Sequence, residues 1–164
     1  MPEIIPLGWA HTVIAIIALI TGYYSFVVHR VISPGNRAGQ IYLVCTLVTA
    51  VTALMIYQHD GFGPAHGLAV LTLLALAAGL LVTRIGLFSK FAAYFQALCF
   101  SATMLFHMVP AITDGLLRLP VGNPVLSDPE DPVLKMFYLA FLVVFVIGVA
   151  LQFIWLKNNR PARP

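Results

Sequence analysis

Residues 56–72, IYQHDGFGPAHGLAVLT, form a short polar interruption between two long apolar runs. Gly63 and Pro64 favour a tight reversal here, because glycine permits unusual backbone angles and proline is tolerated in the first turn of a helix. A reversal at this point lays the two apolar runs side by side. The turn also carries two histidines and an aspartate, which are His59, Asp60 and His66.

The composition indicates an integral membrane protein. The chain has 164 residues, of which 60% are hydrophobic and 9% are charged, whereas soluble domains average about 25% charged residues. Both cysteines, Cys45 and Cys99, lie inside apolar runs. This placement does not suggest the disulfide framework of a small secreted domain.

Five segments are long and apolar enough to cross a bilayer, which takes about twenty residues each. We predict an all-α membrane domain covering residues 1–164, with spans at about residues 8–28, 38–57, 65–83, 90–112 and 133–156. Pro110 is expected to bend or end the fourth span. Residues 113–132, rich in proline and acids, are expected to form a periplasmic loop.

Charge placement predicts the orientation of these spans, because lysine and arginine stay on the cytoplasmic side in short loops. On one side lie seven basic residues, which are Arg30, Arg37, Arg84, Lys90, Lys157, Arg160 and Arg163. On the other lie Arg118, Lys135 and all six acids, which are Glu3, Asp60, Asp114, Asp128, Glu130 and Asp131. The N-terminus is therefore expected outside and the C-terminus in the cytoplasm. Because the basic residues serve orientation, no nucleic-acid partner is predicted.

The faces of the spans predict how they assemble. Small and polar residues recur at helical spacing on the first, second and fourth spans, and such residues allow close helix packing in lipid. The span at 133–156 is bulky on nearly every side. We therefore expect a four-helix bundle with a peripheral fifth helix, which contacts the lipid bilayer and offers a surface for another copy or for a membrane-complex partner.

Histidines near the predicted outer surface form the candidate site. His11, His66 and His107 fall near the outer ends of three different spans, and His29 falls at the opposite end. Ionisable residues inside a membrane bundle are functional candidates by default. We therefore predict a cofactor site at His11, His66 and His107, with three further metal ligands available, which are His59, Asp60 and Asp114.

Two kinds of cofactor suit this cluster. Imidazoles with a carboxylate or water bind zinc, copper or iron, and two histidines on facing helices can ligate one b-type haem. The alternative is purely structural, because histidines near helix ends also serve as polar tips at the membrane interface. No catalytic residues or reaction follow from the pattern.

Three segments carry a resemblance: HRVISPGNRAGQIYL (residues 29–43), GFGPAHGLAVLTLLAL (61–76) and LLRLP (116–120). Over roughly residues 9–120 the chain resembles a family of small bacterial inner-membrane proteins known only as a domain of unknown function. The resemblance implies a shared helical bundle in the bacterial cytoplasmic membrane, and no activity. The matching positions are His29, Arg30, Gly39, Tyr42, Gly63, Pro64 and His66. The family pattern has an acidic residue in the fourth helix, where this chain offers His107 and Asp114.

The sequence thus supports three functional hypotheses. The first is a membrane protein that binds a transition metal or one haem at its outer face. The second is an accessory or assembly subunit of a larger membrane complex, without its own cofactor, docked through residues 133–156. The third is a transporter of a small solute or metal, although inverted repeats and paired broken helices typical of transporters are not evident.

Overall fold

The computed structural model describes residues 6–56, 61–84 and 91–159. Within these ranges the chain forms helices and no β-strand, and five helices are long and apolar enough to cross a membrane. In chain order they are α1 (Pro6–Tyr24), continued by the π-helix η1 (Ser25–His29), then α2 (Arg37–Met55), α3 (Pro64–Arg84), α4 (Ala92–Arg118) and α5 (Pro132–Asn158). The prediction of an all-α protein with five helices able to cross a membrane is confirmed for these residues.

Local signals in the sequence fix where two of these helices begin. Asn36 precedes α2, and its side-chain oxygen accepts a hydrogen bond from the Gly39 backbone N–H at 2.8 Å. Asp131 precedes α5 and accepts from the Val133 N–H at 2.8 Å, with Pro132 in the first helical position. Both are N-caps that satisfy backbone donors left open at a helix start.

The fourth helix is longer than predicted, because it runs to Arg118 rather than ending near residue 112. Pro110 lies inside it. Proline removes one backbone donor, and membrane helices tolerate that loss where neighbouring groups compensate. The prediction that residues 113–132 form the loop is therefore wrong at its start: Thr113 and Asp114 are helical, and the connection to α5 begins after Arg118.

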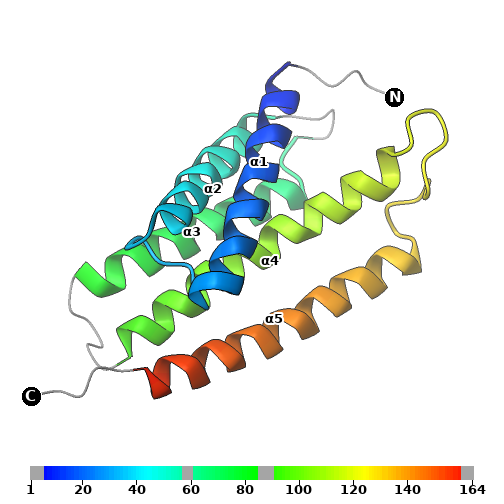
Figure 1. Cartoon of the computed structure of the whole chain (residues 1–164). Coiled ribbons are helices and arrows are strands. Elements are labelled where there is room, and N and C mark those ends of the chain that lie inside the picture. The colour runs from blue at the N-terminus through cyan, green and yellow to red at the C-terminus, as the bar shows by residue number, and fades with distance from the viewer. Residues whose placement is uncertain (1–5, 57–60, 85–90, 160–164) are drawn as a thin grey trace, which may run out of the picture.

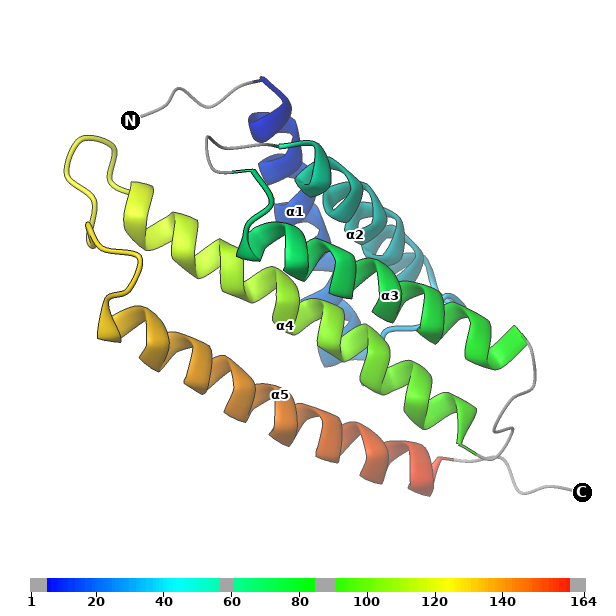
Figure 2. The ribbon, with the colours of Figure 1, turned by 180° about the vertical axis from the view of Figure 1, so that it is seen from behind.

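Helices that follow each other in the chain pack against each other, and α1 also contacts α4. Figures 1 and 2 show α1, α2, α3 and α4 gathered together, with α5 lying along α4 at the edge of the molecule. In α5 only Leu134 and Gln152 are buried. The start of α1 and the end of α5 lie at opposite ends of the structure (Figure 1).

Two glycines bring helices close together. A Cβ atom on Gly22 of α1 would lie 2.8 Å from the ring of Tyr42 on α2. A Cβ atom on Gly79 of α3 would lie 2.5 Å from the ring of Phe100 on α4. Tyr42 and Phe100 are fully buried. Each large ring therefore fills the space that a missing side chain leaves on the neighbouring helix, which is how small residues promote packing in lipid.

Candidate functional site

His11 points from the first part of α1 toward α2. Its Nδ1 lies 2.9 Å from Thr52 Oγ1. The Thr52 hydroxyl donates its single hydrogen to the backbone carbonyl of Val48 or Thr49, at 2.9 and 3.1 Å, so it can only accept from the imidazole. His11 therefore carries its proton on Nδ1, and its Nε2 holds the free lone pair.

His107 on α4 reaches the same helix, α2. Its Nε2 lies 3.1 Å from Thr46 Oγ1, and its ring packs edge-on against Tyr42 with ring centroids 6.3 Å apart. The Tyr42 hydroxyl lies 2.6 Å from Thr103 Oγ1. Tyr42, Thr46 and Thr103 are all 0% exposed, so these hydroxyls are closed to lipid and water.

Donation has a fixed direction at one end of this group. Thr103 donates its hydrogen to the Phe100 carbonyl at 2.8 Å, so Tyr42 donates to Thr103. The bond between Thr46 and His107 Nε2 runs in the direction that the tautomer of the ring sets: in the tautomer protonated on Nε2 the imidazole donates, and its lone pair is on Nδ1. Networks in which every member is paired hold side chains rigidly in a low-dielectric interior.

These contacts place polar side chains at two positions along α2, one shared with α1 and one shared with α4. We name the two groups together the histidine–threonine seam, and its members are His11, Tyr42, Thr46, Thr52, Thr103 and His107. His11 and His107 lie within electrostatic range of each other across the seam. Both imidazoles thus reach α2 from separate helices.

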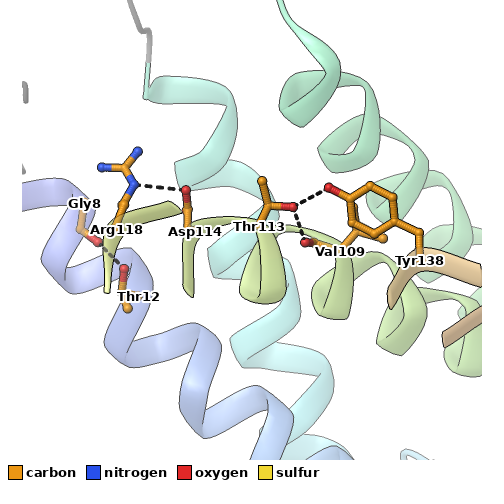
Figure 3. Close-up of polar contacts among 7 residues, drawn as sticks. All are labelled: Gly8, Thr12, Val109, Thr113, Asp114, Arg118 and Tyr138. Atoms are coloured by element: carbon orange, nitrogen blue, oxygen red, sulfur yellow. Dashed lines mark hydrogen bonds and ion pairs between the residues drawn. The ribbon is translucent and has the colours of Figure 1, made fainter. Parts of the chain in front are cut away.

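Asp114 lies beyond His107 on α4, also within electrostatic range of His11. Its Oδ1 accepts a hydrogen bond from Arg118 Nε at 3.0 Å, in an i, i+4 ion pair (Figure 3). The Asp114 side chain is 64% exposed and that of Arg118 is 37% exposed. Exposed pairs with this spacing contribute only about 0.3–0.5 kcal/mol, so the pair is easily exchanged for another partner.

His66 is held separately at the start of α3. Its Nδ1 accepts a hydrogen bond from the Gly63 N–H at 3.1 Å, its ring stacks on Phe62 with centroids 5.1 Å apart, and it is 5% exposed. These contacts tie His66 to its own turn. His29 lies at the opposite end of the first span, against Tyr24. The predicted ligands His59 and Asp60 lie outside the described residues.

The predicted ligands therefore meet only in part. Among residues 6–56, 61–84 and 91–159, no three His, Cys, Asp or Glu side chains lie close enough together to hold a metal ion. His11 and His107 share the seam, Asp114 lies near His11, and His66 is turned toward its own loop.

Two residues important for this site were missing from the sequence prediction. Thr52 orients His11. It is not among the small and polar residues that recur at helical spacing on the second span, and no other sequence pattern points to it. Arg118 holds Asp114, and the i, i+4 spacing of opposite charges was a usable signal. Because the fourth span is predicted to end near residue 112, Asp114 and Arg118 fall outside the predicted helix, and their helical spacing is not recognised.

Polar contacts also join α4 to α5. Ser101 Oγ donates to Gln152 Oε1 at 3.0 Å, with both residues buried. The hydroxyls of Thr113 and Tyr138 lie 2.7 Å apart (Figure 3), and Thr113 also donates to the Val109 carbonyl at 2.7 Å. Because Thr113 has only one hydrogen, Tyr138 is the donor between the two hydroxyls.

Comparison of the chain with protein-family models, with curated proteins and with solved structures found no match. The site described above is therefore interpreted from its own geometry and chemistry.

Proposed function

We propose that this protein is a membrane protein that binds a transition-metal ion through His11 and His107. One observation carries the proposal: the two imidazoles come from different helices, and each is oriented by a hydroxyl of the same helix, α2. Histidine is uncommon inside membrane bundles because burying an ionisable group is unfavourable, and where it occurs it generally serves function.

The hydrogen bonds of the two rings suit metal binding. A histidine ligand commonly donates its second ring N–H to a fixed acceptor, which sets the tautomer and the orientation of the ring. Thr52 can accept from His11 Nδ1, and Thr46 can accept from His107 Nε2 when that nitrogen carries the proton. His11 Nε2 and His107 Nδ1 are then the nitrogens that would bind the ion, and Thr46 and Thr52 are the positioning residues.

Imidazole ligands suit zinc, copper or iron. Water, Asp114, His66, His59 or Asp60 would supply the remaining ligands, as predicted from the sequence. One b-type haem is the alternative cofactor for the same histidine pair.

Metal binding can be tested on protein purified in detergent. We expect elemental analysis to find one metal per chain, or titration of the metal-free protein with Zn²⁺ to show one saturable site. His11→Ala and His107→Ala should each weaken binding strongly, and His29→Ala, at the other end of the first span, should not. An absorption band typical of haem would favour the alternative cofactor. Parent protein that binds neither metal nor haem would refute the proposal.

We place the protein in a bacterial cytoplasmic membrane, with the N-terminus outside and the seam in the outward half. Support comes from the segregation of basic residues to one side of the spans. In a variant whose native cysteines are replaced, a cysteine at Asn123 should react with an impermeant thiol reagent from the periplasm, and one at Asn159 should not. The opposite labelling would reverse the orientation.

A second candidate function is that of an accessory subunit docked through α5. The observation behind it is the exposure of large apolar side chains over the whole length of that helix, such as Met136 at 69%, Val144 at 66% and Leu151 at 61%. Lipid alone can cover such a surface. A chain shortened after residue 131 should keep a folded core and lose association with itself or with its complex; unchanged association would argue against this role.

A further inference from the structure

We propose that one end of the helix bundle binds the headgroups of anionic phospholipids, and that Arg30 and Arg37 make the central contacts. These two arginines border the turn between η1 and α2. The surface lies at the opposite end of the spans from His11, so it neither contains nor requires the proposed metal site.

Four exposed cations gather at this end, which we name the basic end. Arg30 directly follows η1, Arg37 opens α2, Arg84 closes α3 and Lys157 lies in the last turn of α5. Figures 1 and 2 show these helix ends on the side of the molecule away from the start of α1. Within the part of the chain that the structure describes, none of the four makes an ion pair. Their charge is therefore open to a partner outside the chain.

The cations at the other end of the spans are arranged differently. Arg118 Nε lies 3.0 Å from Asp114 Oδ1, and Lys135 Nζ lies 3.0 Å from Glu130 Oε2. Each cation there has a carboxylate of the chain as its partner, whereas the four cations of the basic end have no such partner among the described residues. Charge complementarity thus favours an external anion at the basic end.

The turn between η1 and α2 holds its two arginines on an ordered backbone. The Gly35 N–H donates to Ser33 Oγ at 3.1 Å, and Gln40 Nε2 donates to the Pro34 carbonyl at 2.9 Å. Ile32 is 2% exposed, so the turn is anchored in the apolar interior. A backbone that is ordered beforehand lowers the entropy lost when both guanidinium groups meet one membrane surface.

Aromatic side chains place the basic end at the depth of lipid headgroups. Tyr23 and Tyr24, which come shortly before Arg30, are 67% and 52% exposed, and Trp155 comes just before Lys157. Tyrosine and tryptophan favour the interface between membrane and water. The cations that follow them along the chain therefore reach the lipid phosphates.

The chemistry of the headgroup suits these side chains. A guanidinium is planar, always charged and binds phosphate through two parallel hydrogen bonds. A basic residue near an anionic membrane surface strengthens association by about a factor of five. Lipids with a net negative charge, such as phosphatidylglycerol, should therefore be preferred over zwitterionic lipids around the protein.

The experiment measures which lipids surround the full-length protein in vesicles of phosphatidylcholine. A trace of spin-labelled phosphatidylglycerol or of spin-labelled phosphatidylcholine is added, and electron spin resonance gives the fraction of each label that the protein immobilises. We expect the parent to enrich the anionic label about twofold to fivefold over the zwitterionic one. Arg30→Gln/Arg37→Gln should lose most of this enrichment, and Arg30→Lys/Arg37→Lys should keep at least about half, because lysine also binds phosphate.

The matched control is Arg118→Gln/Lys135→Gln, which removes the same charge from the other end and should keep most of the enrichment. Added NaCl should reduce the enrichment in the parent, because salt screens exposed charges. Inorganic phosphate that replaces chloride at equal ionic strength should change nothing further. Circular dichroism checks that the exposed substitutions leave the helices intact.

Four results would overturn the proposal. The parent could immobilise both labels equally, or its preference could be independent of salt. Equal losses in the two glutamine variants would show a general effect of net charge. Displacement of the anionic label by inorganic phosphate would show a site for a soluble anion instead of lipid.

Discussion

The histidine–threonine seam and α5 both belong to helices long and apolar enough to cross a membrane, but they are held in place differently. Along the seam, α1, α2 and α4 meet through close contacts at glycine and through fully buried hydroxyls. Along α5, large apolar side chains face outward and two hydrogen bonds reach α4, at Gln152 and at Tyr138. The difference shows that bulk and apolar character alone do not bring a helix into this bundle.

The physical reason is that lipid is as apolar as leucine, so burying leucine against another helix gains little. Close packing and hydrogen bonds remain as the attractive terms. The seam uses both and fixes two histidines. The α5 helix has few of either, and its outer surface stays available to lipid or to another protein.

The largest expected effect comes from filling the close contacts of the bundle. Gly79→Ala places a methyl group 2.5 Å from the Phe100 ring and 3.1 Å from Cys99 Cβ, and such overpacking destabilises by about 1–3 kcal/mol. Gly148→Ala on α5 meets nothing within 4 Å and should be neutral or slightly stabilising, because alanine favours helices. Unfolding in mixed detergent would measure both. Equal effects would remove the contrast between the close-packed four-helix part and α5.

A smaller difference is expected from deleting one hydroxyl in each region. Tyr42→Phe removes a fully buried hydrogen bond at 2.6 Å to Thr103, which should lower the free energy of unfolding by about 1 kcal/mol. Tyr138→Phe removes a part-buried bond to Thr113 and should have about half that effect. A larger loss from Tyr138→Phe would mean that α5 is part of the stable core.

The smallest effect is expected at the buried contact between α4 and α5. Gln152→Leu removes the partner of Ser101, and interhelical hydrogen bonds in membranes average about 0.6 kcal/mol. In the double variant with Ser101→Ala, the second substitution should add little, because the bond is already lost. Additive effects of the two substitutions would show that they act independently and that the bond does not hold α5.

Much of the fold could be predicted from the sequence, because each helix is a long apolar run of the length that a bilayer demands. Pro110 misled the prediction of the fourth helix, since proline is read as a helix end in water and is accommodated inside this membrane helix. The packing of α5 on α4 depends on Gln152, which is hidden in an otherwise apolar run. Its contact with Ser101 requires knowledge of how two helices face each other.

For the candidate site, the sequence predicts which residues to consider, whereas their geometry requires the structure. His11 and His107 lie on polar stripes of their helices, and the structure brings both to α2. For His66, the sequence predicts a place at the outer start of the third span but not the hydrogen bond to Gly63 that turns the ring toward its own loop. The resemblance to an uncharacterised bacterial family and the predicted roles of His59 and Asp60 stay predictions.

The central claim is that His11 and His107 bind one metal ion directly, and X-ray absorption at the zinc edge tests it best. The Zn²⁺-loaded protein should show imidazole scattering with nitrogen ligands at about 2.0–2.1 Å. The double variant His11→Ala/His107→Ala, treated identically, should lose that signal, and His29→Ala should keep it. A zinc spectrum free of imidazole in the parent, or one unchanged in the double variant, would contradict the account.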